Sequence, residues 1–241
     1  MNPYPRIPVL VYHKIAEPSV NDANPNTCVT PANFKRQMLA LFLMGYRTAD
    51  HGEYLKARLG LPARLPEKPV LITFDDAFES VLTRALPVLK KYGFSAAVFM
   101  VSSALGGNAF WDGETSASGN RLLDAGELKL LMAEGWVIGS HGVSHSNFRR
   151  LDGPELAAEA AHSRTALEAA LGSEVSWFAY PYGANTPAAR QAVAAAGYRI
   201  GFATEDGDGG VFSVPRRIIS GKSGLLNFWL RLRQAVKKSV L

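Results

Sequence analysis

The sequence has a single cysteine, Cys28, and no long run of apolar residues. One cysteine excludes an internal disulfide and is typical of a protein from a reducing compartment. No apolar run approaches the roughly 18 residues that a membrane-spanning helix needs. The N-terminal segment also lacks the long apolar region and the small-residue cleavage site of a signal peptide. We therefore expect a cytoplasmic protein without a membrane span.

Motifs for several common chemistries are also missing. The chain has no GxSxG nucleophile motif, no P-loop and no GxGxxG dinucleotide motif. No basic run is interleaved with aromatic residues, so we expect no nucleic-acid partner.

What the sequence does contain is an ordinary globular composition with positive charge concentrated at one end. Its 241 residues are 47% hydrophobic and 20% charged, with a net charge of +5, which fits a soluble domain with a full core. The C-terminal segment LLNFWLRLRQAVKKSVL places apolar residues at helical spacing on one face: Leu225, Trp229, Leu232, Val236 and Val240. This basic amphipathic helix either packs on its own domain, the commoner arrangement, or makes peripheral contact with the inner face of an anionic membrane.

Strand-like and helix-like segments alternate along the chain. Short apolar runs predict strands over 9–12, 70–74, 97–101, 137–140, 177–179 and 200–203. Helical patterns, most of them followed by glycine, cover 31–44, 79–92, 124–134, 154–171 and 187–196. This alternation predicts an α/β fold with a parallel sheet covered on both faces. We expect one domain over 1–222 and the amphipathic helix over 223–241.

Polar residues gather at the ends of the predicted strands. Six or seven strand–helix units favour a closed or nearly closed barrel, or an open doubly wound sheet, and both place active sites at the carboxyl ends of their strands. His13 follows the first strand, Asp75 and Asp76 the second, and His141 and His145 the fourth. Two histidines and one carboxylate are the ligand set of a catalytic metal site. One aspartate could bind the metal while its neighbour acts as a base, because the cation relieves the repulsion between the two carboxylates.

The segments TFDD, SHGVSH and FAYPYG, in this order and spacing, resemble the motifs of the polysaccharide deacetylases (carbohydrate esterase family 4, NodB homology domain). The resemblance covers most of the chain, and PVLVYHKI is most similar to the branch of poly-β-1,6-N-acetylglucosamine deacetylases. It implies a single distorted (β/α)7 barrel and metal-dependent hydrolysis of an N-acetyl, or sometimes an O-acetyl, group on a sugar. Carried over residue by residue, it implies these roles: Asp75 as the base; Asp76, His141 and His145 as metal ligands; the Tyr182 backbone N–H as an oxyanion donor; and His13 as the general acid.

Three positions depart from the family pattern. Ala77 stands where Gly usually follows the aspartate pair, and Gly142 where Ser or Thr usually follows the first metal histidine; neither change removes a ligand. Many members carry an arginine two residues before the proline of the third motif, where it pairs with the base, and Ala179 occupies that position here. Arg216 or Arg217 could supply the charge from another strand, and the sequence does not decide between them.

The resemblance also sets expectations for the cofactor and the substrate. A divalent metal is implied, with Zn2+ as the first expectation, although Co2+, Ni2+ and Mn2+ fit the same ligands. The substrate would be an acetylated sugar in a polymer, an oligosaccharide or a lipid-linked precursor.

Two other functions share part of the pattern. Fe(II) oxygenases use a two-His, one-carboxylate triad and require O2. A non-catalytic glycan-binding protein could use the same scaffold, but it would have no need of the complete set of Asp75, Asp76, His141 and His145.

Overall fold

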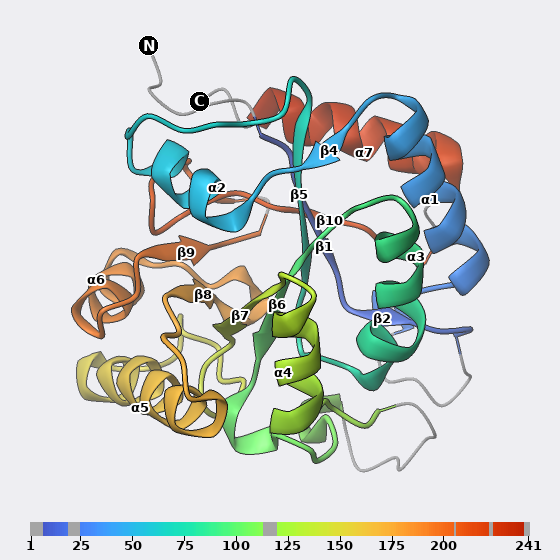
Figure 1. Ribbon diagram of the computed structural model, residues 1–241. Coiled ribbons are helices and arrows are strands. Elements are labelled where there is room, and N and C mark those ends of the chain that lie inside the picture. The colour runs from blue at the N-terminus through green and yellow to red at the C-terminus, as the bar shows by residue number, and fades with distance from the viewer. Residues whose placement is uncertain (1–6, 19–24, 113–119, 205, 222–223, 239–241) are drawn as a thin grey trace.

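The fold is built on a curved parallel sheet. The computed structural model describes residues 7–18, 25–112, 120–204, 206–221 and 224–238. Its main sheet has eight strands in the order β10-β1-β5-β6-β7-β8-β9, with β4 paired to the start of β5 (Figure 1). The strands are β1 (Val9–Tyr12), β4 (Arg47–Thr48), β5 (Pro69–Phe74), β6 (Ala97–Met100), β7 (Val137–Ser140), β8 (Trp177–Ala179), β9 (Ile200–Phe202) and β10 (Arg217–Ile218). A small second sheet pairs β2 (Lys14–Ile15) with β3 (Cys28–Val29).

The main sheet forms a half-barrel whose two end strands approach each other. Among the described residues, β9 and β10 are not paired, but a parallel bridge joins Phe202 to Val214. Val214 N donates to Gly201 O, and Ala203 N donates to Val214 O, both at 2.9 Å. The prediction of an α/β distorted barrel is therefore confirmed, and of the two arrangements that the alternation allowed, the barrel is the one found.

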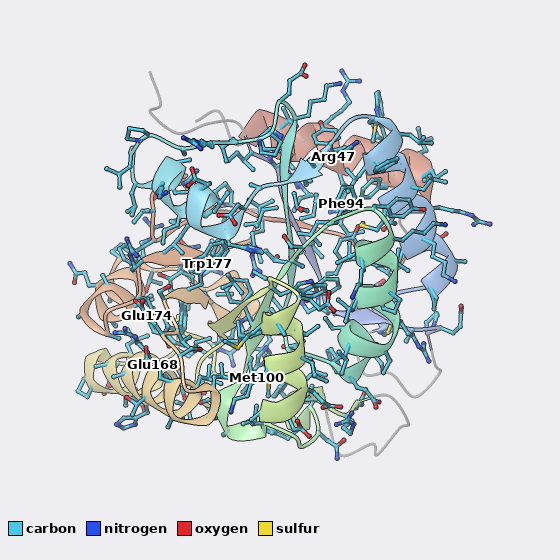
Figure 2. All side chains as sticks on the ribbon, in the orientation of Figure 1. Arg47, Phe94, Met100, Glu168, Glu174 and Trp177 are labelled. Atoms are coloured by element: carbon cyan, nitrogen blue, oxygen red, sulfur yellow. The ribbon has the colours of Figure 1, made fainter. Side chains whose placement is uncertain are left out.

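Apolar side chains cover both faces of the sheet, as the continuous apolar strands predict. Successive residues point to opposite faces, so Ile72 lies in the core that packs against the outer helices, whereas Leu71 lies in the inner core. In the inner core, the Trp177 ring lies 5.7 Å from the Tyr54 ring of α2 (His51–Arg58) and 5.1 Å from the Phe202 ring. Figure 2 shows Trp177 between α2 and the strands. The two cores hold the strand ends in fixed positions.

The predicted strands agree closely with the observed ones. β1, β7 and β8 have the predicted bounds, β6 and β9 each end one residue earlier, and β5 begins one residue earlier, at Pro69. The sequence did not predict β2, β3, β4 and β10. Each of these strands has two residues, which is too short for an apolar alternation to be recognised.

The helices agree less evenly. Four of them, α1 (Pro31–Leu43), α4 (Ala125–Ala133), α5 (Gly153–Leu171) and α6 (Pro187–Ala195), lie within one residue of their predicted bounds. The predicted helix over 79–92 is found as a continuous helical segment over 79–91, but it contains a π-helical turn, Val81–Ala85, before α3 (Leu86–Lys91). Pro87 has no N–H to donate, which interrupts the regular α-helical hydrogen bonds there. The sequence missed α2, whose start is capped by Asp50 accepting from Glu53 N.

The C-terminal helix α7 (Leu225–Lys238) packs against α1, β1 and β10. Its buried side chains are Phe228, Leu232 and Ala235, whereas Leu225 and Trp229 remain 50% and 41% exposed. The predicted apolar stripe is therefore wrong in part: the contact is centred on Phe228, and Val240 lies outside the described residues. No helix in the described ranges is long and apolar enough to cross a membrane.

Candidate active site

Four parallel strands end at one cavity. β1, β5, β7 and β8 run in the same direction, and the residues that follow them line a cavity of about 540 Å³. Its walls include His13, Asp75, Asp76, His141, His145 and Tyr182. The volume lies within the roughly 300–1,000 Å³ typical of small-molecule sites. The fold thus brings six of the residues named from the sequence to one place.

Asp76, His141 and His145 form a buried group suited to a divalent cation. Asp76 Oδ1 lies 3.3 Å from His145 Nε2 and 3.8 Å from His141 Nε2. Two ligands of a tetrahedral zinc ion at their usual bond lengths lie about 3.4 Å apart. Within the described part of the chain, Asp76 Oδ1 is buried without a hydrogen bond, a costly state for a carboxylate that a bound cation would relieve. The donor set therefore fits a metal ion.

The neighbouring backbone fixes His141 as a neutral ligand. His141 Nδ1 donates to Ala179 O at 2.7 Å, so Nε2 carries the lone pair and faces Asp76. Burial lowers the pKa of His141 to about 4, despite the opposing effect of the Asp75 charge. A neutral imidazole with an oriented Nε2 is the form that binds a metal.

His145 is held by aromatic rings. Its ring stacks on Trp111, with centroids 4.3 Å apart, and the Tyr182 ring lies 4.8 Å away. Its Nδ1 is buried and has no hydrogen-bond partner among the described residues, in contrast to Nδ1 of His141. Stacking therefore orients the second histidine where a hydrogen bond orients the first. Sequence reasoning missed Trp111, because an aromatic residue in a long polar loop carries no motif.

Asp75 has a different environment from its neighbour. Both of its carboxylate oxygens accept from Arg216, at 2.6 and 2.7 Å, in a bidentate pair. The Arg216 side chain is fully buried and also donates to Ala203 O and to Thr73 Oγ1. Burial alone would raise the pKa of Asp75, but the charge and hydrogen bonds of Arg216, with further contributions from His141 and His13, together outweigh burial and the pKa falls to about 2. The arginine beside Asp75 is thus Arg216, in the chain just before β10.

Left-handed backbone conformations are concentrated at this site. Asp76, Ala77, His145 and Tyr182 have φ between 57° and 69°, and they are the only non-glycine residues in the described chain with positive φ. Such residues cost roughly 1–3 kcal/mol each and persist where surrounding contacts determine them. Ala77 has φ 59°, which explains why glycine would be favoured at that position.

The loop that carries the two histidines is fixed by Glu159 of α5. Its carboxylate accepts from Val143 N at 2.7 Å and from Ser144 N and Oγ. Gly142 has φ 81°, and a Cβ there would lie 2.9 Å from Glu159 Oε2. Glycine therefore replaces the more usual Ser or Thr because the carboxylate occupies the side-chain space. No sequence motif indicates that Glu159 belongs to the site.

The remaining candidates lie at the cavity or away from it. His13 lines the cavity, and its Nδ1 is buried without a hydrogen bond in the described residues. Tyr182 is 58% exposed at the rim, in the turn Pro181–Gly183. His51 packs edge-on against Trp177 in the inner core, and His162 is exposed on α5, so both histidines lie outside the site.

Comparison with known proteins identifies the family. The sequence profile of the polysaccharide deacetylases matches residues 63–201, more than half of the chain. The chain belongs to the polysaccharide deacetylase family. This deacetylase shares 29% identity over 224 residues with YxkH of Bacillus subtilis (strain 168), whose name provisionally assigns it to the same family. That similarity spans 91% of this chain and 74% of YxkH.

Solved structures agree with the deacetylase fold. The deacetylase PplD of Streptococcus pyogenes, solved in complex with acetate, superposes with a TM-score of 0.78 at 26% identity, covering 94% of this chain and 97% of PplD. IcaB from Ammonifex degensii superposes with a TM-score of 0.74 at 23% identity, covering 95% and 97%. The family assignment makes this deacetylase a hydrolase that acts on polysaccharides. Its Asp76, His141 and His145 form a group able to hold a metal ion.

Proposed function

We propose that this protein removes N-acetyl groups from an N-acetylhexosamine-containing glycan, oligosaccharide or lipid-linked sugar in a metal-dependent hydrolysis that releases acetate. The family match and the cavity support the reaction class. The N-terminal motif PVLVYHKI, similar to that of poly-β-1,6-N-acetylglucosamine deacetylases, supports the sugar and a role in exopolysaccharide biosynthesis.

The observation that carries the proposal is the different pairing of two adjacent carboxylates. Asp75 is bound through both oxygens by Arg216, whereas Asp76 faces the two histidines. Asp75 Oδ2 nevertheless lies 4.0 Å from His141 Nε2, so both carboxylates face the same space. A base beside a metal site needs this division, because one carboxylate must stay off the cation to accept a proton.

Each residue at the site has its own role in the reaction. A bound divalent cation, with zinc the first expectation, would supply Lewis acidity at the acetyl carbonyl. Asp75 accepts the proton of the water that attacks that carbonyl, and Arg216 keeps the carboxylate oriented. The Tyr182 backbone N–H, by the family resemblance, donates to the developing oxyanion. His13 delivers a proton to the sugar nitrogen as the C–N bond breaks, which leaves a free amine and acetate.

Acetate release from N-acetylglucosamine oligomers tests the proposal. We expect release that stops with a chelator, returns on adding Zn2+, Co2+, Ni2+ or Mn2+, and continues without O2. Asp75→Asn should bind metal but release no acetate, and His141→Ala should lose both metal and activity. His162→Ala, an exposed histidine outside the cavity, is the control and should behave as the unmodified protein. Metal-independent release, or full activity in Asp75→Asn, would contradict the mechanism.

A further inference from the structure

Helix α7 is apolar over a much wider arc than its contact with the domain requires. At 100° per residue, the buried Phe228, Leu232 and Ala235 span about 60° of the helix circumference. Leu225, Trp229, Leu226 and Leu230 extend this arc on one side to a total of about 220°. These four side chains are 50%, 41%, 72% and 44% exposed. The positions of Arg233 and Lys237 fall within the same arc, nearer the C-terminal end of the helix. A helix that only covers its own domain would not need this second apolar face.

The charge around this exposed face has one sign. From Leu225 to Leu241 the chain has four Lys and Arg residues, Arg231, Arg233, Lys237 and Lys238, and no Asp or Glu. Arg233 lies within the exposed arc, with its guanidinium 4.4 Å from the centre of the Trp229 ring. Arginine on tryptophan combines an apolar surface with a cation at its edge, a pairing suited to a boundary between apolar and anionic surroundings.

These two properties restrict what can cover the face. A second copy of this chain would bring the same cations against each other, which opposes association. An acidic protein surface would match the charge but would need its own apolar patch against Leu226 and Leu230. A lipid bilayer with anionic headgroups has both an apolar interior and negative charge. The leucines would enter the boundary of the acyl chains while the cations contact the headgroups. We propose that the face of α7 formed by Leu225, Leu226, Trp229, Leu230 and Arg233 docks this protein on anionic membrane surfaces.

Docking through α7 would bring the cavity close to the bilayer. Ile218 and Ser220 line the cavity, and α7 begins five residues after Ser220. Five residues span at most about 18 Å even when fully extended. A lipid-linked or membrane-associated glycan is then the substrate class that could reach the site while the protein is docked. This last step rests on the proposed deacetylase function, whereas the docking itself does not.

Vesicle flotation of the full chain tests the docking. The probes are vesicles of phosphatidylcholine alone and vesicles of phosphatidylcholine mixed with phosphatidylglycerol. We expect flotation with the anionic vesicles only, weakened by added salt because salt screens the charges. The double variant Leu226→Glu, Leu230→Glu should bind these vesicles at least roughly tenfold more weakly. Both leucines are exposed, so the variant should keep the thermal midpoint and circular dichroism spectrum of the unmodified protein.

The control is Leu130→Glu, which makes the same change at a 58% exposed leucine on α4 and should float like the unmodified protein. Absence of flotation with anionic vesicles, equal flotation with neutral ones, unchanged binding of the double variant, or equal loss in the control would each overturn the proposal. An acidic protein as the true partner would give the first of these results. Acetate release from soluble oligomers should be the same in all variants, so a failure of docking is distinguishable from a failure of the proposed function.

Discussion

Replacing Arg216 by methionine should destabilise the protein more than any loss of a surface ion pair. The Arg216 side chain is fully buried, and its partner Asp75 is nearly so. Methionine fills much of the same space but leaves the Asp75 carboxylate buried without its two hydrogen bonds, and Ala203 O without its donor. Breaking a buried ion pair by removing one partner costs about 3–5 kcal/mol. That is a large part of the roughly 5–15 kcal/mol that stabilises a typical domain.

A second substitution shows whether the lost stability comes from leaving one buried charge without its partner. Asp75→Asn alone leaves the Arg216 guanidinium buried and unpaired, so it should also destabilise. The double variant, Asp75→Asn with Arg216→Met, has no buried charge left at this position. Its loss should therefore be smaller than the sum of the two single losses by about 1–3 kcal/mol, the usual coupling of residues in direct contact.

Urea unfolding at pH 7 in the presence of a chelator measures these differences without a contribution from bound metal. The control is Arg121→Met, which removes an arginine that also binds two carboxylates, Glu79 and Glu127, but is 37% exposed. The free energy of unfolding of this control should fall by less than about 1 kcal/mol, because exposed ion pairs contribute little to stability. If Arg216→Met costs no more than this control, or if the losses at Asp75 and Arg216 simply add, the pair does not stabilise the site as we argue.

Three further predictions concern other parts of the structure. Burial lowers the pKa of His51 from 6.5 to about 4, so between these pH values the unfolded chain binds a proton that the folded protein does not. This one group should lower the free energy of unfolding by about 3 kcal/mol as the pH drops from 6.5 to 4, and the free energy of unfolding of His51→Gln, measured in urea, should depend less steeply on pH by that amount. Trp111→Ala should weaken metal binding by roughly 10- to 100-fold in a titration, Trp111→Phe should restore most of it, and Phe110→Ala, a 54% exposed neighbour, should not change it. Gly142→Ser should destabilise by about 1–3 kcal/mol in urea, and a normal unfolding midpoint would show that the Glu159 carboxylate can move aside.

The buried strands could be predicted from the sequence because each is a compact apolar run with a distinct boundary. The strands Val9–Tyr12 and Val137–Ser140 are followed directly by His13 and His141, which line the cavity. The end of each apolar run therefore located both the strand and the site. Helix α2 could not be predicted in this way. It has eight residues, and its buried Tyr54 and Leu55 pack inside the barrel, so their partners lie on strands far along the chain.

The ligand candidates could be named from the sequence because they follow predicted strands in short motifs, whereas no such position marks the residues that orient them. Arg216 lies 141 residues from Asp75, and its neighbour Arg217 has the same side chain. Which of the two reaches Asp75 depends on the face of the sheet to which each side chain points, because adjacent residues near a strand point to opposite faces. Trp111 and Glu159 likewise act through contacts in space, and no sequence spacing predicts these contacts.

The two adjacent carboxylates can face one cavity because the backbone turns at Asp76, just past the end of β5 at Phe74. In a continuing strand Asp75 and Asp76 would point to opposite faces of the sheet. Asp75 N still donates to Tyr12 O at 3.0 Å, as in the strand, but Asp76 and Ala77 have φ of 69° and 59°. The left-handed turn brings Asp76 Oδ1 within 3.8 Å and Asp75 Oδ2 within 4.0 Å of the same His141 nitrogen. The backbone strain at these two residues is therefore the cost of placing a base and a ligand side by side on consecutive residues.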